Sequence, residues 1–282
     1  MGTLYIVGTP IGNLEDLTLR AIRVLGQVDL VAAEDTRVTR RLLTHLGIRA
    51  RLASYHQHNW ERQIPELLKA LASGDVALVT DAGMPMVSDP GSELVSQATA
   101  HGYPVDVAPG PSAVTTAVAL SGMAQSKTDS GEFYFMGFLP RRSKDRRAQL
   151  ERAKSIDARL IIFEAPHRIK ATLKDIGAIL GDRDIAVCRE MTKLHQEVFR
   201  GTVSGALDHF AEPLGEIVLV VAGAKPAFAD SMDHRLEEAE QKMIELRASG
   251  TNSRDAIAQV SLETGLPRNL LYRLWVASGT RH

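Results

Sequence analysis

With 282 residues, 44% of them hydrophobic and 24% charged, the chain is long enough for two domains and a small appendage. Its net charge of −1 excludes a general polyanion binder, so any contact with nucleic acid has to come from a local basic patch. The single cysteine, Cys188, excludes a disulfide framework, and no apolar stretch approaches the roughly 20 residues that span a bilayer, so we expect a cytoplasmic protein.

The first part of the chain alternates short apolar runs with amphipathic stretches. The runs predicted to be buried strands are TLYIVG, VDLVAAED, DVALVTDAG and PVDVAPG. Helical patterns such as ERQIPELLKALASG lie between them. This alternation predicts an α/β domain with a largely parallel sheet over residues 1–118.

A polar stretch of small residues, 124–132, predicts a linker or loop before a second set of strands. These strands are EFYFMGF, RLIIFEAP, DIAVCREMT, EVFRGTVS and GEIVLVVAGA. Several follow one another without a full helix, so we expect a second α/β domain at 119–226 that is mixed and partly antiparallel.

No strand pattern remains in the last part of the chain, which we expect to form a small helical domain at 227–282. Ser253 is the predicted N-cap of one helix, and Gly265 with Pro267 predicts a helix–turn–helix break. An Ala-rich stretch around Pro226 predicts a linker to it. Its interleaved Arg and aromatic residues give a weak helix-turn-helix signal, and we expect a supporting RNA-docking module. We expect Tyr272, Leu274 and Trp275 to form the core of this small domain rather than platforms on which bases stack.

The first strand opens into the loop GTPIGN, which resembles none of the usual phosphate loops. A Walker loop ends in Gly-Lys-Ser/Thr, whereas this one ends in Gly-Asn-Leu. A dinucleotide fingerprint needs a third glycine, where this chain has Leu14, Glu15 and Asp16. The two carboxylates would repel a phosphate, so we expect the loop to hold something uncharged or cationic, or merely to turn the chain.

Two further strand ends open into loops of the same kind. TDAGMPMVSDPG (80–91) is dense in glycine, proline and carboxylate, and APGPSAVTTAVALSG (108–122) has a Pro-Gly-Pro turn before a helix of small residues. The carboxyl ends of neighbouring parallel strands share one sheet edge, so these loops should form a single ligand-binding crevice.

The segments GTPIGNLEDLTLRA, AAEDTR, DAGMPMVSDPG, PGPSA, FEAPHR and REMTK, in this order, resemble the ribosomal RNA small-subunit methyltransferase I family. It is the RNA-modifying branch of the tetrapyrrole-methylase superfamily, and the resemblance covers nearly the whole chain. It implies S-adenosylmethionine in a cleft between two α/β domains. The implied reaction is 2′-O-methylation of a cytidine in the decoding region of 16S ribosomal RNA, with the small ribosomal subunit as partner. A homodimer is the superfamily's usual state.

The resemblance also implies the cofactor contacts. They are Pro10 and Ile11 in the first loop, Gly83, Met84 and Val87 in the second, Ser112 and Ala113 in the third, and Phe163 and Ala222 at ends of second-domain strands. The family usually has Thr at position 84 and Leu at position 191, where this chain has methionine.

Polar residues after the apolar strands supply the candidates for chemistry. Glu190 and Glu164 are the preferred bases for removing the hydroxyl proton, and Lys193 is a phosphate anchor or, with a depressed pKa, the base itself. Asp35 could orient the ribose or lock the first loop, with Arg37 beside it. For each of these residues a structural ion pair is an equal alternative. His56 and His58 lack further ligands at suitable spacing, so we expect no metal.

The segment LPRRSKDRRAQLERAK (139–154) breaks the charge balance of the chain. We expect it to contact RNA phosphates rather than serve only as a solvated helix face. The predicted RNA-binding residues are Arg37, Arg141, Arg142, Lys144, Arg146, Arg147, His167 and Arg168.

Two alternative functions stay open on the sequence. One is a methyltransferase of the same superfamily that acts on a tetrapyrrole or a protein side chain. The other is a non-catalytic RNA-binding assembly factor, which the carboxylate-rich strand ends disfavour because they would repel RNA.

Overall fold

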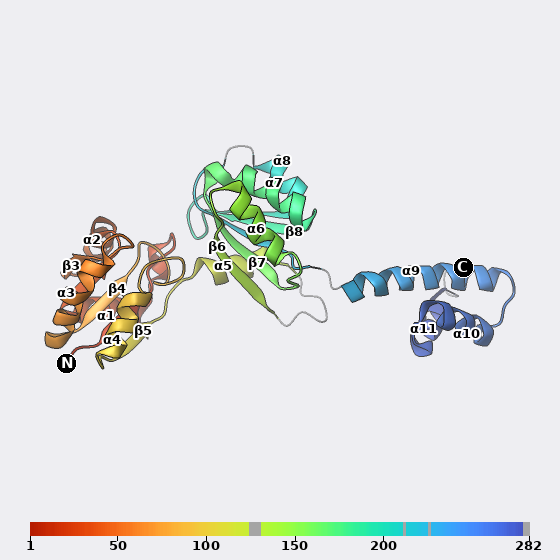
Figure 1. Ribbon diagram of the computed structural model, residues 1–282, viewed down its shortest axis with the longest axis horizontal. Coiled ribbons are helices and arrows are strands. Elements are labelled where there is room, and N and C mark those ends of the chain that lie inside the picture. Colours follow the sequence, from red (N-terminus) through yellow and green to blue (C-terminus); the bar gives the residue numbers. More distant parts are fainter. Residues whose placement is uncertain (124–130, 211–212, 225–226, 279–282) are drawn as a thin grey trace. The chain divides into compact units, whose positions relative to one another are not determined.

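The computed structural model describes residues 1–123, 131–210, 213–224 and 227–278 (Figure 1). They form two compact units, Met1–Gly223 and Ala224–His282. Most of the predicted linker at 124–132, and Pro226, lie outside the described residues. Among the residues described, no helix has both the length and the apolar surface needed to cross a membrane.

The first sheet has five parallel strands in the order β3-β2-β4-β1-β5. Its strands are β1 (Leu4–Val7), β2 (Leu30–Ala33), β3 (Arg51–Ser54), β4 (Val76–Val79) and β5 (Val105–Ala108). Its helices are α1 (Leu19–Gln27), α2 (Thr36–His45), α3 (Trp60–Ser73) and α4 (Ser92–Ala100), with a 3₁₀ turn, η1 (Leu14–Asp16). The predicted parallel α/β fold is confirmed.

Helices cover both faces of this sheet, which explains why its central strands are apolar throughout. Side chains of α1 and α2, such as Leu25 and Leu43, pack on one face. Side chains of α3 and α4, such as Leu67 and Leu94, pack on the other. All four residues of β4 are buried as a result.

The second sheet has the order β6-β7-β10-β8-β9. Its strands are β6 (Phe133–Phe138), β7 (Arg159–Glu164), β8 (Asp184–Arg189), β9 (Glu197–Thr202) and β10 (Ile217–Val221). Only β6 and β7 pair in parallel, and β10 runs antiparallel to both β7 and β8. The predicted mixed sheet is therefore confirmed.

Helices also cover both faces of the second sheet. One face carries α6 (Ser143–Ala153), η2 (Pro166–Arg168), α7 (Ile169–Leu180) and α8 (Val203–His209). The other face packs against α5 (Ala113–Ser121), whose Val114 and Ala117 contact the strands (Figure 1). Because α5 follows β5 directly in the chain, it joins the edge of the first sheet to the face of the second.

The second unit consists of α9 (Ala227–Ala248), α10 (Ser253–Thr264) and α11 (Arg268–Ser278). Its own small core includes Met243, Val260 and Leu271, with Leu274 and Trp275 packed against it, whereas Tyr272 is exposed and does not belong to the core. The N-cap of α10 is Asn252 rather than the predicted Ser253, because the Asn252 side chain accepts the hydrogen bond from the Asp255 N–H. Gly265 ends α10 with a φ of 69°, as its predicted role as a helix breaker requires.

Candidate functional site: a cavity at the edges of both sheets

The three glycine- and proline-bearing loops of the first sheet meet, as the sequence predicted, and the first two are hydrogen-bonded to each other. The Thr9 N–H donates to Gly83 O at 2.9 Å, and the Gly83 N–H donates to Thr9 O at 3.1 Å. The Thr9 hydroxyl also donates to Thr80 O at 3.0 Å. The first loop, after β1, is thereby fixed to the second loop, after β4.

Two glycines of the first loop are needed because other backbone segments pass close to them. A Cβ on Gly8 would lie 2.8 Å from the Cα and N of Gly110, in the loop after β5. A Cβ on Gly12 would lie 2.8 Å from Met191 O and 2.7 Å from Thr192 Oγ1, in the loop after β8. The first loop therefore packs against loops of both sheets, and glycine is what permits the approach.

These loops border a cavity of about 400 Å³, a volume typical of small-molecule sites. The second sheet contributes Phe138 from β6, Phe163 and Glu164 from β7, and the segment 215–218 at the start of β10. Phe163 lies edge-on to Phe138, with ring centroids 5.5 Å apart. The cavity thus has an aromatic wall from the second sheet and a loop wall from the first.

Left-handed backbone occurs at four non-glycine residues of the described chain, all in the two loops that border this cavity. Met86 and Ser88 have φ of 72° and 69° in the second loop, and Glu190 and Thr192 have φ of 50° and 64° on either side of Met191. Residues held in this region cost about 1–3 kcal/mol each and persist where the surroundings enforce them, most often at functional sites.

Three carboxylates from the first sheet line the cavity: Glu34, Asp81 and Asp89. Burial raises the pKa of Glu34 and of Asp81 above their usual ranges, against the hydrogen bonds that each accepts from a backbone N–H. Burial, together with the negative charges of Glu34 and Asp81, raises the pKa of Asp89 to about 7. A cation bound in this cavity would favour the ionised forms of these carboxylates, which burial and mutual repulsion otherwise disfavour.

A second cavity of about 340 Å³ adjoins the first and shares Ile11, Asp81, Ala82 and Glu216 with it. The Lys193 ammonium lines this second cavity and lies 2.9 Å from Glu190 Oε1 and 3.2 Å from Glu216 Oε2. Burial lowers the pKa of Lys193, but the hydrogen bond with Glu190 and the charge of Glu216 outweigh it, so the pKa lies above its usual value. Lys193 is therefore a cation here and not a base.

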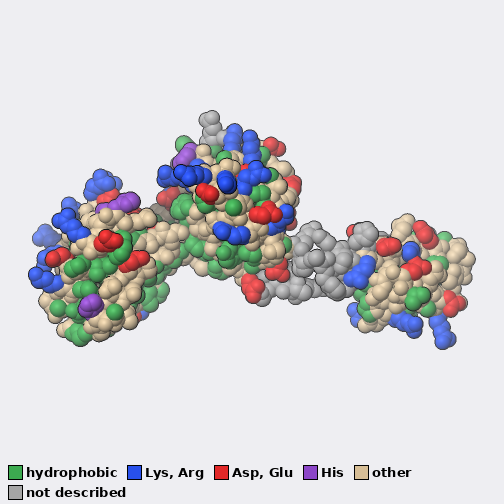
Figure 2. All heavy atoms as spheres, viewed as in Figure 1, with side chains coloured by type: hydrophobic (Ala, Val, Ile, Leu, Met, Phe, Trp, Pro, Cys, Tyr) green, Lys and Arg blue, Asp and Glu red, His purple; other side chains and the backbone are tan. Residues whose placement is uncertain are grey.

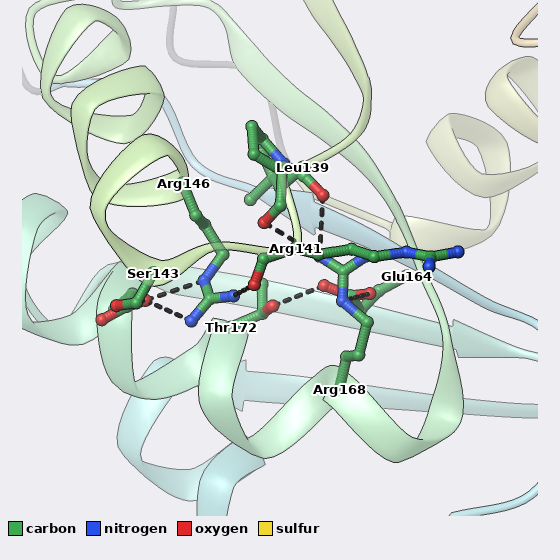
Figure 3. Close-up of polar contacts among 9 residues, drawn as sticks. Leu139, Arg141, Ser143, Arg146, Glu164, Arg168 and Thr172 are labelled. Carbon is green, nitrogen blue, oxygen red and sulfur yellow. Dashed lines mark hydrogen bonds and ion pairs between the residues drawn. The ribbon is translucent and has the colours of Figure 1, made fainter.

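The two glutamates preferred as bases from sequence are both engaged by other groups. Glu190 accepts from the Glu216 N–H and from Lys193, and these two hydrogen bonds lower its pKa. Glu164 is 2% exposed, accepts from Thr172 and the Ala165 N–H, and lies 3.3 Å from the Arg168 guanidinium (Figure 3). Asp35 caps α2 and is paired with Arg37 at 2.6 Å, outside both cavities.

Most of the cofactor residues inferred from the resemblance line the first cavity: Ile11, Gly83, Met84, Val87, Ser112, Ala113 and Phe163. Pro10 lines the second cavity instead. Ala222 lies at the opposite edge of the sheet, where its N–H donates to Asp184 O. The reason is strand direction: β10 is antiparallel to β7 and β8, so its first residue, Ile217, is the one at the cavity.

The residues predicted to bind RNA separate into exposed and buried groups. The side chains exposed on the surface are Arg37, Arg141, Arg142, Lys144, Arg147 and His167. Arg146 is 5% exposed, and its guanidinium pairs with Asp175 at 2.6 Å (Figure 3). Arg168 is half-buried and donates to Leu139 O at 2.7 Å (Figure 3). Arg146 and Arg168 thus hold the basic loop in place instead of presenting their charges to solvent.

Asp81 and Asp89 are not among the residues singled out from the sequence, although both lie in TDAGMPMVSDPG, a segment recognisably rich in carboxylates. Both lie in the loop after β4, and their spacing in that loop does not indicate that their side chains line one cavity with Glu34. For the histidine pair, His56 Nδ1 accepts from the His58 N–H. No group of three or more potential metal ligands occurs among the residues that the structure describes.

Comparison with known proteins identifies the family of the chain. The model of the tetrapyrrole (corrin/porphyrin) methylases matches residues 3–206. The chain is similar to a ribosomal RNA small subunit methyltransferase I from Thermotoga maritima, with 51% identity over 79% of this chain and 99% of the relative. It is also similar to one from Halalkalibacterium halodurans, with 44% identity over 97% of this chain and 94% of the relative.

Solved structures share the fold at low sequence identity. A diphthine synthase superposes with a TM-score of 0.61 at 16% identity, over 79% of this chain and 90% of that one. A uroporphyrin-III C-methyltransferase from Thermus thermophilus gives a TM-score of 0.54 at 22% identity, over 78% of this chain and 94% of that one. With its two α/β sheets and its matching sequence, the chain belongs to the tetrapyrrole methylase family and, within it, to the ribosomal RNA small subunit methyltransferase I family.

Proposed function

We propose that the protein transfers a methyl group from S-adenosylmethionine to the 2′-hydroxyl of a cytidine in the decoding region of 16S ribosomal RNA. The observation that carries the proposal is the cavity bordered by three adjacent loops and three carboxylates, in a chain 41–51% identical to proteins named ribosomal RNA small subunit methyltransferase I. An enzyme with this substrate would work in the cytoplasm.

The residues of the first cavity fit S-adenosylmethionine in charge and shape. Its sulfonium and ammonium groups are cationic, and Glu34 and Asp81 supply the negative charge that would hold them. Phe138 and Phe163 offer an apolar wall for a flat base. At the start of α5, Ser112 makes no side-chain cap, so backbone N–H groups of the first turn are available to polar groups of a ligand. Bound here, the cofactor would supply an electrophilic methyl group.

The acceptor hydroxyl must lose a proton, and we propose Asp89 as the group that receives it. A proton acceptor works best with a pKa near the working pH, and that of Asp89 is about 7. Glu190 and Glu164 are less suited, because hydrogen bonds already occupy their carboxylates. In this arrangement Glu190 positions Lys193, whose ammonium in the second cavity would contact a phosphate of the substrate.

The proposed function has a direct test. The purified protein is incubated with labelled S-adenosylmethionine and small ribosomal subunits that lack the modification, and ribose methylation is mapped by mass spectrometry of nuclease fragments. We expect one labelled cytidine in 16S RNA. Label in a protein or a tetrapyrrole would establish one of the alternative methyltransferases. Tight subunit binding without label would establish an assembly factor.

The exposed basic residues around α6 are proposed to bind RNA phosphates, and the helical unit 224–282 is proposed as a supporting RNA-docking module. We also propose a homodimer, for which the exposed apolar side chains on edge strands β5 and β6 (Val105, Val107, Phe133 and Tyr134) offer a surface. Light scattering after gel filtration would give the mass.

A further inference from the structure

Helix α2 presents a basic face to solvent. Arg37, Arg40, Arg41, Thr44 and His45 recur at helical spacing and line a shallow hollow on the surface, while Thr39 and Leu43 face the core. The helix contains no aspartate or glutamate. Figure 2 shows Lys and Arg side chains gathered on the lobe that carries α2. In a chain with a net charge of −1 this face is a local excess of positive charge.

Two of these arginines have no carboxylate beside them. Arg37 is paired with Asp35, so its charge is partly neutralised. No ion pair within the described part of the chain involves Arg40 or Arg41, and both side chains are exposed. Exposed guanidinium groups without partners are suited to bind phosphate oxygens in a bidentate manner.

The basic face is continuous with the two cavities. Arg41 and His45 line the second cavity as well as the surface hollow, and Lys193 lines the second cavity from the other sheet. The second cavity shares Asp81 and Ala82 with the first. The basic side chains of Arg41 and Lys193 therefore connect the surface of α2 with the cofactor cavity. The face from Arg37 to His45 extends roughly 12 Å along the helix axis, at 1.5 Å per residue.

We propose that this face of α2 binds the sugar-phosphate backbone of the RNA strand beside the target nucleotide, with Arg40 and Arg41 on phosphates and the nucleotide itself in the second cavity. The inference rests on the proposed function and adds to it the entry route of the substrate. Phosphate contacts of this kind fix the register of a strand without reading its sequence. The face has no large apolar anchor of the sort a folded protein partner would need, since Val38 is its one exposed apolar residue.

The test compares two double variants that each remove two exposed positive charges from one helix of the first sheet. Arg40→Gln/Arg41→Gln changes α2, and Arg62→Gln/Lys69→Gln changes α3 as a matched control. Binding to 16S RNA and to small subunits is measured between 50 and 200 mM salt, alongside S-adenosylmethionine affinity and methyl transfer. For the α2 variant we expect the negative slope of log K against log salt to become shallower by about 1.4, or about 0.7 for each single-strand phosphate that the variant no longer binds.

The α2 variant should also raise the KM for RNA at least tenfold, with cofactor affinity and kcat unchanged, while the control behaves as wild type. A salt slope and KM equal to those of the control would overturn the inference, even if the wild type methylates RNA. Conversely, a wild type that methylates no RNA, protein or tetrapyrrole would contradict the proposed function. A shallower slope of log K against log salt in the α2 variant would then still support the RNA-binding face. If the α2 variant loses binding to an acidic peptide but not to RNA, the face serves a protein partner and the inference is wrong.

Discussion

The buried ion pair between Arg146 and Asp175 gives a prediction that separates a structural arginine from an RNA-binding one. The side chains are 7% and 12% exposed, and Arg146 Nε and Nη2 both contact Asp175 Oδ2, at 2.7 and 2.6 Å. Its Nη1 also donates to Arg141 O at 3.3 Å. Removing the cation in Arg146→Met leaves a buried carboxylate without its partner, which costs about 3–5 kcal/mol.

For a unit of this size 1 kcal/mol corresponds to about 2–4 °C, so the melting temperature of Arg146→Met should fall by roughly 6–20 °C. Thermal unfolding followed by far-UV circular dichroism at pH 7 measures it. The neighbour Arg147 is exposed, and Arg147→Met should change stability by no more than about 0.5 kcal/mol. Arg146→Met/Asp175→Leu, which removes both charges, should recover most of the loss. A single variant that melts within about 2 °C of wild type would refute the reasoning.

Three further predictions concern the cavities. The folded pKa of Asp89, about 7, lies above that of an unfolded chain, so folding takes up a proton and this group's contribution to stability falls as pH rises from about 4 to 7. The melting temperature of Asp89→Asn minus that of wild type should therefore grow over this range, with turnover at least about 100-fold lower; a flat difference would contradict the pKa. Gly8→Ala should cost about 1–3 kcal/mol and weaken cofactor binding, measured by calorimetry, because its Cβ meets backbone of the third loop; Gly26→Ala, where the added methyl meets nothing closer than 3.9 Å, is the control. Glu190→Gln should raise the KM for RNA more than it lowers kcat, since Lys193 loses the carboxylate that positions its ammonium group. An unchanged KM would show that Glu190 does not position Lys193 for RNA binding.

The strand-end loops could be predicted because their chemistry is local. Apolar runs that end in glycine and proline identify parallel strands and their turns, and parallel strands place those turns at one edge. Strand β3 is not evident from the sequence, because it is a four-residue edge strand, RLAS, with no fully buried side chain. Helix α8 is not evident either, because its residues follow β9 without a turn signal.

Site residues that depend on strand direction or on long-range electrostatics could not be predicted from the sequence. An apolar run does not specify the direction of its strand in a mixed sheet, so the sequence cannot tell that Ala222 ends β10 at the edge opposite the cavity. The shifted pKa of Asp89 arises from burial, from the charge of Glu34 in another loop, and from Asp81, whose side chain the sequence alone does not place beside it. Arg146 did carry a signal, since it lies four residues before Leu150 and seven before Ala153, on the buried face of α6.

The left-handed residues beside the cavity bear on how heat-resistant this protein can become. Glycine adopts a positive φ without a steric penalty, so replacing Ser88 or Met86 by glycine would relieve backbone strain in the second loop. The same substitution would loosen a wall of the pocket that must be rigid before a ligand arrives. Relatives adapted to higher temperatures should therefore gain stability elsewhere, in their helices and surface ion pairs. They should keep the positive φ angles at the positions of Met86, Ser88, Glu190 and Thr192.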